Sequence, residues 1–364
     1  MPPVTERVKM KATRPSELKL TLAPQRRFEA IDIAARCSDL SDVLLRHPKA
    51  LFCSFHTTAG YLDRSLSVRM HNRQDLLARF FHAFRSLFPE GGEYRHDQMD
   101  LRTELSEAQK IIEPRNGDSH LTFIGARMRN CVTQRTDPKS PVYFIELDGA
   151  TQAFRRERKT TIIGFDQERL IAQMSVSIPV SKHPIDSINL ADPRLGLIES
   201  VNDLIRKAGV GHARVDLIVD SAERNVGLTV NEYETLLIQN DLMDVLRDPF
   251  RFARLKTRHM IDDPLSIPGK TLSYAQYDAV RILNSLMEAL GLDQSSFERL
   301  VGKLMSLPAR CFFRSRRVSF LAAGDEGQDA PKLLTGPYQS PILVQWQSTE
   351  KQIRNVDVNL VELS

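Results

Sequence analysis

The sequence predicts an α+β protein built from two tandem units, and three observations lead to this prediction. The length of 364 residues is enough for two domains of ordinary size. Alternating apolar stretches typical of strands outnumber helical segments, without a regular strand–helix–strand alternation. The order of segments in the first half recurs in the second. We therefore expect a flexible lead-in at residues 1–17, a first domain at 18–167 and a second at 168–364.

The first half should contain one long amphipathic helix among strands. Apolar residues recur at helical spacing over 72–88, and Pro89-Glu90-Gly91-Gly92 ends this segment. A shorter helix is expected over 39–46, with Asp39 near its start. The expected strands cover residues 18–22, 50–55, 120–125, 142–147 and 159–165, with a further apolar stretch at 28–33.

The second half repeats this order and adds material. We expect strands or apolar stretches at 174–179, 185–190, 214–219, 227–232, 340–344 and 356–361. A helix over 195–208 should end at Gly209, and another should pass through Asp241 and Val245. Two further amphipathic helices form a helical insert at about 273–307. Their apolar stripes are typical of packing surfaces, although a ligand site remains an alternative.

Composition places the chain among soluble globular proteins. Apolar residues make up 41% and charged residues 26%. No run approaches the roughly 18 apolar residues of a membrane helix, and residues 1–17 contain no apolar signal-peptide core. The widely spaced Cys37, Cys53, Cys131 and Cys311 form no Cys-x-x-Cys pair, which is typical of reduced thiols. We therefore predict a cytoplasmic protein that does not bind membranes.

Charge and missing motifs exclude several function classes. The net charge of +4, with a pI near 8.8, favours small anionic partners but is too weak and dispersed to indicate nucleic acid. The dense basic run Arg155-Arg156-Glu157-Arg158-Lys159 leads into a strand and is expected at a strand edge. We find no Walker-type loop, dinucleotide fingerprint or Gly-x-Ser-x-Gly elbow, so no nucleotide cofactor is expected.

One stretch of the first half combines strand and site features. The apolar run of residues 50–55 ends at His56-Thr57-Thr58-Ala59-Gly60, where small residues can turn the chain and expose backbone N–H groups. A histidine here can titrate, bind a metal or pair with an anion, or it can simply cap the strand. Two further histidines follow, in Tyr94-Arg95-His96-Asp97 and in Ser119-His120-Leu121.

With these motifs the chain resembles the YjbQ-like family, also known as secondary thiamine-phosphate synthases. The first half matches the family at His56-Thr57-Thr58-Ala59, Asp75, Tyr94-Arg95-His96-Asp97, Ser119-His120-Leu121 and Arg158. It lacks the family's Asn-Glu step, where Asp63-Arg64-Ser65-Leu66 stands, and its Gly-Thr-Trp-Gln turn, near Asp137-Pro138-Lys139. The second half has the opposite losses. It keeps Leu228-Thr229-Val230-Asn231-Glu232, Asp241, Gly336-Pro337-Tyr338-Gln339 and Arg354, but Glu223 takes the histidine position.

The resemblance implies two tandem YjbQ-like β-sandwich domains with flanking helices. The family assembles as a trimer with candidate sites near subunit contacts, so a homo-oligomer is expected, either a trimer or a pseudo-symmetric assembly. The complementary losses predict one composite site, with histidines from the first half and Asn231, Glu232 and Gln339 from the second. Independent decay of both halves, with no working site, is the alternative.

Two kinds of chemistry suit these residue types. His56, His96 and His120 could bind a divalent metal, most naturally zinc, with Asp97 orienting one ring. Alternatively, they act as general acids or bases and as donors to a phosphate. The expected catalytic residues are His56, Thr57, His96, Asp97, His120 and Glu232. The expected substrate-binding residues are Thr58, Arg158, Asn231, Gln339 and Arg354.

The resemblance implies an enzyme acting on a small phosphorylated or heterocyclic substrate. Its reaction would be condensation of a pyrimidine pyrophosphate with a thiazole phosphate, or a related reaction in specialised metabolism. A metal-dependent enzyme with a three-histidine site is a second hypothesis. A non-catalytic binding or scaffold protein that docks a partner through the helical insert is a third.

Overall fold

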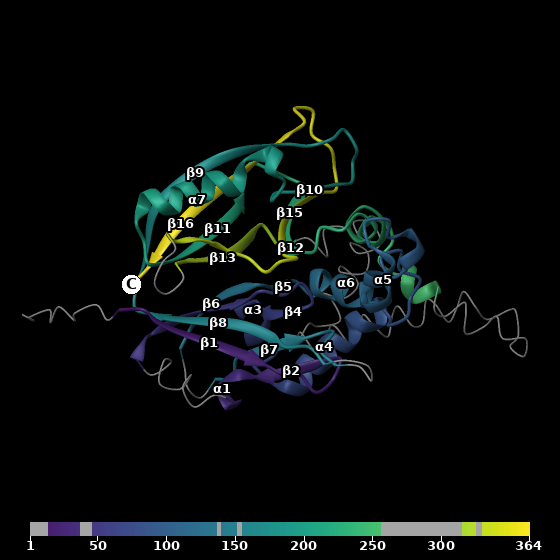
Figure 1. Cartoon of the computed structure of the whole chain (residues 1–364), viewed down its shortest axis with the longest axis horizontal. Coiled ribbons are helices and arrows are strands. Elements are labelled where there is room, and N and C mark those ends of the chain that lie inside the picture. Colours follow the sequence, from purple (N-terminus) through teal and green to yellow (C-terminus); the bar gives the residue numbers. More distant parts are fainter. Residues whose placement is uncertain (1–13, 37–45, 137–139, 151–154, 256–314, 325–329) are drawn as a thin grey trace, which may run out of the picture.

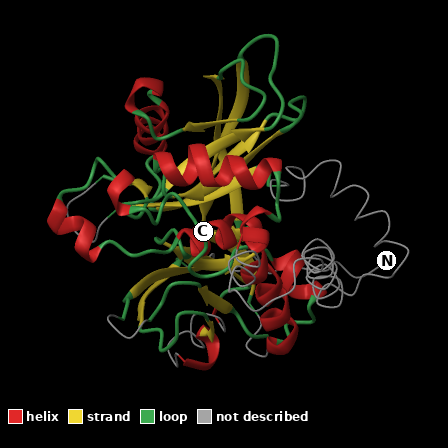
Figure 2. Ribbon diagram, turned by 90° about the vertical axis from the view of Figure 1, so that its right-hand side faces the viewer, coloured by secondary structure: helices red, strands yellow, loops and turns green. Residues whose placement is uncertain are grey.

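The computed structural model describes residues 14–36, 46–136, 140–150, 155–255, 315–324 and 330–364. Figure 1 shows the two halves as two groups of strands, the first in purple to teal and the second in teal to yellow. Figure 2 shows the same two groups of strands after a 90° turn, with helices in front of and around them. The predicted helical insert at 273–307, and the helix at 39–46 apart from Arg46, lie outside the described residues.

The first half contains two antiparallel sheets. The larger has the order β1-β8-β3-β6, and the smaller has the order β2-β7-β4-β5. The strands are β1 (Ser16–Leu22), β2 (Glu29–Asp32), β3 (Lys49–Ser54), β4 (Ala59–Leu62), β5 (Met128–Arg129), β6 (Cys131–Arg135), β7 (Tyr143–Glu146) and β8 (Arg158–Phe165). The helices are α1 (Ile33–Arg36), α3 (Arg64–Arg69), α4 (Gln74–Leu87), the 3-10 turn η1 (Met99–Leu101), α5 (Glu107–Ile112) and α6 (Gly117–Gly125).

The second half also contains two antiparallel sheets, with the orders β14-β13-β11-β16-β9 and β10-β15-β12. The strands are β9 (Glu168–Pro179), β10 (Asp186–Asn189), β11 (His212–Val219), β12 (Val226–Asn231), β13 (Arg317–Ala323), β14 (Lys332–Leu334), β15 (Ser340–Gln345) and β16 (Ile353–Leu363). The helical segments are η2 (Pro193–Leu195), α7 (Leu197–Ala208), the π-helical η3 (Leu236–Asp241) and α8 (Leu242–Arg247).

The two halves use the same strand order. In each, the first strand pairs with the last and the last pairs with the third, giving β1-β8-β3 in one half and β9-β16-β11 in the other. The smaller sheets also correspond, as β2-β7-β4 and β10-β15-β12. The order of elements expected from the sequence is therefore present, whereas the duplication that would explain it stays a prediction.

The two halves contribute side chains to one shared apolar core. One buried cluster joins Phe80 and Phe84 of α4 to Leu237 and Leu242 of the second half and to Val344 of β15. Such side chains each contribute roughly 1.5–3 kcal/mol when fully buried, so a cluster with members from both halves ties them together. The amphipathic pattern over 72–88 correctly predicted α4, which buries its Leu and Phe side chains.

The strand predicted at residues 120–125 is wrong, because these residues belong to α6. Every residue of α6 is buried, so no exposed polar face reveals a helical period, and the polar–apolar alternation of His120-Leu121-Thr122-Phe123 is equally typical of a strand. The sequence also did not indicate β5, β6, β13, β14, α3 or α5. No helix among the described residues is long and apolar enough to cross a membrane.

Candidate functional site

The loop that carries His56 is held by hydrogen bonds and close packing from the second half. β3 ends at Ser54 and β4 begins at Ala59. The Gln339 side-chain amide donates to the backbone oxygens of Ser54 (3.0 Å) and His56 (2.8 Å). A Cβ on Gly336 would lie 1.9 Å from the Phe55 oxygen, so only glycine permits this approach. The turn 336–339 of the second half therefore packs directly on the histidine loop of the first.

His120 meets the Asn-Glu step of the other half. It lies buried on α6, with Nδ1 2.7 Å from Asn231 Oδ1. Asn231 Nδ2 donates to the Thr57 oxygen (3.1 Å), and Oδ1 accepts from the Glu232 backbone N–H (2.9 Å). These contacts fix the amide orientation, so His120 Nδ1 must donate and Nε2 carries the lone pair. That Nε2 lies 3.7 Å from Glu232 Oε2.

Burial sets the protonation of this pair. Desolvation and the neighbouring His96 ring hold the pKa of His120 well below its ordinary value, so the imidazole is neutral near pH 7. Burial raises the pKa of Glu232, an effect that the His96 ring partly opposes. A carboxyl with a raised pKa beside a neutral imidazole lone pair is an arrangement suited to proton transfer.

His96 lies behind this pair as a cation. Its ring packs edge-on against His120 with centroids 5.1 Å apart. Nδ1 lies 3.0 Å from Glu234 Oε2, and Nε2 lies 3.2 Å from Asn116 Oδ1. Because Asn116 Nδ2 donates to Asp148 (2.8 Å), its Oδ1 must accept from His96. Both ring nitrogens therefore donate, as they do only in an imidazolium.

The pKa of His96 agrees with this assignment. Burial lowers it, but the hydrogen bond to Glu234 and the nearby Asp97 and Glu232 carboxylates raise the net pKa above the ordinary value. Arg102 Nη1 lies 3.3 Å from the same Nδ1 and opposes the charge, but the Glu234 carboxylate is closer. Asp97 does not bond either ring, because its Oδ1 accepts from the Gly117 N–H (2.9 Å).

Arg158 is fully engaged inside the first half. It donates to both carboxylate oxygens of Glu146 (2.5 and 2.7 Å) and to Thr58 Oγ1 (3.1 Å). A bidentate arginine–carboxylate pair fixes both groups strongly. Arg158 and Thr58 therefore hold the histidine loop in place.

A large cavity opens in front of these groups. Its volume is about 1470 Å³. The sequence-predicted residues that line it are His56, Thr57, Thr58, His120, Arg158 and Glu232. Cationic side chains from the first half, Arg27, Lys110, Arg115, Arg155, Arg156 and Lys159, line it as well. The negative charges of acidic residues in the wall are partly compensated by these cations. For example, Arg156 pairs with Asp148 at 2.7 Å.

Some predicted residues do not face this cavity. His96, Asp97, Asn231 and Gln339 lie outside its lining and act on the residues that form it. Arg354 lies in the second half, where it pairs with Glu223 (2.8 Å) and lines a separate hollow of about 340 Å³. The structure therefore brings together the predicted residues of both halves except Arg354.

The predicted three-histidine metal site does not fit the arrangement. His96 uses both ring nitrogens, and His120 uses Nδ1, in bonds to protein groups. His56 Nε2 accepts from the Lys159 backbone N–H. Among the described residues, no three His, Cys, Asp or Glu side chains are placed to hold a metal ion.

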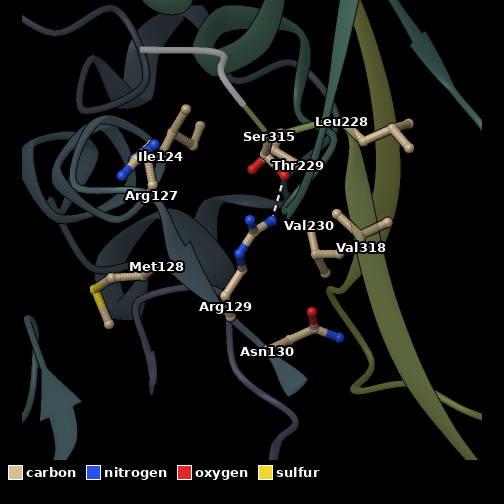
Figure 3. A pocket seen from close by; sticks show the side chains of 10 residues that line it. All are labelled: Ile124, Arg127, Met128, Arg129, Asn130, Leu228, Thr229, Val230, Ser315 and Val318. Atoms are coloured by element: carbon tan, nitrogen blue, oxygen red, sulfur yellow. Dashed lines mark hydrogen bonds between the residues drawn. The ribbon is translucent and has the colours of Figure 1, made fainter. Parts of the chain in front are cut away.

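A much smaller hollow also lies between the halves (Figure 3). Its volume of about 10 Å³ corresponds to about one water molecule. Arg129 points across it and donates to the Ser315 hydroxyl and to the Arg317 oxygen (2.7 Å). This hollow belongs to the contact between the halves.

No family model and no curated protein matches the sequence. Solved structures are similar over about half of the chain. A YbjQ-like protein of unknown function from Sulfolobus solfataricus P2 has 13% identity and a TM-score of 0.27, covering 54% of this chain and 99% of its own. An uncharacterised YjbQ-family protein from Clostridium acetobutylicum has 14% identity and a TM-score of 0.23, covering 51% and 98%. At these values we interpret the site from its own geometry.

The sequence reading missed three supporting residues, Asn116, Asp148 and Glu234. Asn116 and Glu234 hold His96, and Asp148 holds Asn116. A signal existed for Asp148, because Glu146 ends a strand, Asp148 follows it, and both precede the alternating Arg156 and Arg158, a spacing that allows two arginine–carboxylate pairs. No sequence pattern predicted a role for Glu234, because its partner His96 lies far away in sequence and only the folded chain brings the two together.

Proposed function

We propose that the chain is a tandem, diverged YjbQ-like enzyme that acts on small phosphorylated or heterocyclic substrates. His120 of the first half and Glu232 of the second would exchange the proton of the reaction. The observation that carries this proposal is the approach of His120 Nε2 to Glu232 Oε2, 3.7 Å apart, at the wall of the large cavity. Neither half could form this pair alone.

The cavity favours anionic substrates. Lys159 lies in its wall and forms no ion pair with any described residue, and such an uncompensated positive charge attracts small anions. Its volume exceeds the roughly 300–1,000 Å³ of ordinary ligand pockets, which leaves room for two small reactants. The condensation of a pyrimidine pyrophosphate with a thiazole phosphate, implied by the family resemblance, requires two such anions.

The assigned residues divide the work. Glu232, with its raised pKa, would donate a proton to a leaving or reacting group, and neutral His120 would accept one at Nε2. The buried His96 cation would keep the His120 ring neutral and oriented. Arg158 and Gln339 would hold the His56 loop in register.

The test is Glu232→Gln, with Glu107→Gln as the matched control, because Glu107 lines the same cavity and pairs with Lys110 at its edge. Turnover would be followed as thiamine phosphate formation from the two implied substrates and as pyrophosphate release from other small pyrophosphates. We expect Glu232→Gln to lower the rate by about 10²–10⁴-fold and Glu107→Gln to retain it. Full activity of Glu232→Gln, or no binding or turnover of any of these compounds by the native protein, would contradict the proposal.

Two other expectations stay predictions. The first is a homo-oligomer, and light scattering of the purified protein would measure its oligomeric state. The scaffold hypothesis depends on residues 273–307, outside the described part of the chain, and none of the described residues favours it.

A further inference from the structure

The imidazole of His56 has one tautomer. The Lys159 backbone N–H donates to His56 Nε2 at 2.8 Å. A backbone amide nitrogen can only donate, so Nε2 carries the lone pair and the neutral ring carries its proton on Nδ1. Burial, followed by the Arg158 charge, lowers the pKa of His56 to about 3, which keeps the ring neutral at physiological pH.

The Nδ1–H of His56, a residue of the cavity wall, has no acceptor among the described residues. The side chain is half-buried and lines the cavity, and Nδ1 has no hydrogen-bond partner within the described part of the chain. A polar donor in this position requires an acceptor from solvent or from a ligand.

The surroundings of His56 are cationic. Arg156, Arg158 and Lys159 all act on its ring electrostatically. Arg158 is neutralised by Glu146 and Arg156 by Asp148. Lys159 lines the same cavity and forms no ion pair with any described residue, so its ammonium adds an uncompensated positive charge that acts on the His56 ring.

We propose that His56 Nδ1–H and the Lys159 ammonium form an oxyanion subsite that receives a phosphate or carboxylate oxygen of the substrate. His56 then serves as a fixed neutral donor, not as an acid, a base or a metal ligand. The inference rests on the proposed function only in assuming that this cavity is the substrate site.

The two histidines that face the cavity then have opposite polarity. His56 presents a proton and His120 presents a lone pair, because their protein partners are a donor in one case and an amide oxygen in the other. A matching ligand presents an oxyanion to His56 and a hydroxyl, amine or other transferable proton to His120. This pattern defines the substrate class as a small anion that also carries a proton donor.

Binding of inorganic pyrophosphate, measured by calorimetry, tests the subsite. His56→Ala removes the donor, whereas His56→Asn keeps an amide N–H near the position of Nδ1. A hydrogen bond to a charged group contributes about 1.5–3 kcal/mol, so His56→Ala should weaken binding by about tenfold or more. His56→Asn should recover most of that loss, and His212→Ala, outside the cavity lining, should bind like the native protein.

Nitrogen NMR of the full chain labelled at histidine tests the tautomer without any variant. We expect His56 to show a protonated Nδ1 and an unprotonated Nε2, unchanged from pH 8 to pH 5. A His56 signal that titrates near pH 6.5, or an Nε2–H tautomer, would overturn the inference. Equal pyrophosphate affinity of native and His56→Ala protein would refute the subsite while leaving the proposed function intact. Absence of binding by the native protein would overturn both.

Discussion

Two corresponding arginines, one in each half, have different ion-pair partners. Arg158 and Arg354 each lie in the last strand of their half, and each is buried. Arg158 pairs with Glu146 of β7. In the second half Gln345 lies on the corresponding strand β15, and Arg354 instead pairs with Glu223, which precedes β12.

This difference shows how one topology can serve two purposes. In the first half the arginine is satisfied by its neighbouring strand, so the loop bearing His56 is free to face a cavity. In the second half the loop itself supplies the carboxylate, through Glu223, and only a smaller hollow of about 340 Å³ lies beside Arg354. The second half contributes to the site through Asn231, Glu232 and Gln339, which point toward the other half.

The largest expected effect comes from changing the arginine partners. Glu146→Gln reproduces the second-half arrangement in the first half and leaves Arg158 buried without a counter-charge. We expect a loss of about 3–5 kcal/mol in the free energy of unfolding. Glu223→Gln should cost less, about 1–3 kcal/mol, because Arg354 retains the backbone oxygens of Arg224 and Gln347. Urea denaturation of both variants measures the difference, and the reverse order would contradict the comparison.

Alanine substitutions at two glycines distinguish the effect of the contact between the halves from that of stability within one half. Gly336→Ala places a methyl group against the Phe55 oxygen, and we expect a loss of up to about 3 kcal/mol together with weaker pyrophosphate binding. Gly209→Ala affects only the left-handed end of α7 (φ 62°) and should cost about 1–2 kcal/mol. Calorimetric binding and thermal unfolding check both. Unchanged pyrophosphate affinity in Gly336→Ala would show that the turn does not hold the site.

The smallest effect is a pair of opposite pH dependences. The folded pKa of His96 is raised, so its contribution to stability is complete below its unfolded pKa of about 6.5 and is lost as pH rises through the folded value. The folded pKa of His120 is lowered, so its contribution is present above about pH 6.5 and is lost as pH falls. Unfolding free energies of native, His96→Asn and His120→Asn proteins between pH 5 and 9 should show these opposite slopes. Parallel slopes would refute the assigned charge states.

The sequence predicted the parts of the molecule that have local signals. The α4 stripe and the apolar strands of both halves have clear periods, and the complementary motifs indicated that His120 would meet Asn231 and Glu232. The α6 helix could not be predicted because it is buried on all sides. Glu234 and Asp148 could not be assigned roles because their partners lie far away in sequence. The ring tautomers depend on individual backbone contacts, such as Lys159 N–H to His56, that no pattern encodes.

The apolar cluster shared by α4, η3, α8 and β15 has a further consequence for the evolution of this chain. In this cluster, each half covers apolar side chains of the other half that would otherwise be exposed to water. A fragment encoding one half would therefore carry an incomplete core and only part of the cavity wall. We therefore expect a substitution at this cluster in either half to be selected for its effect on the packing of both.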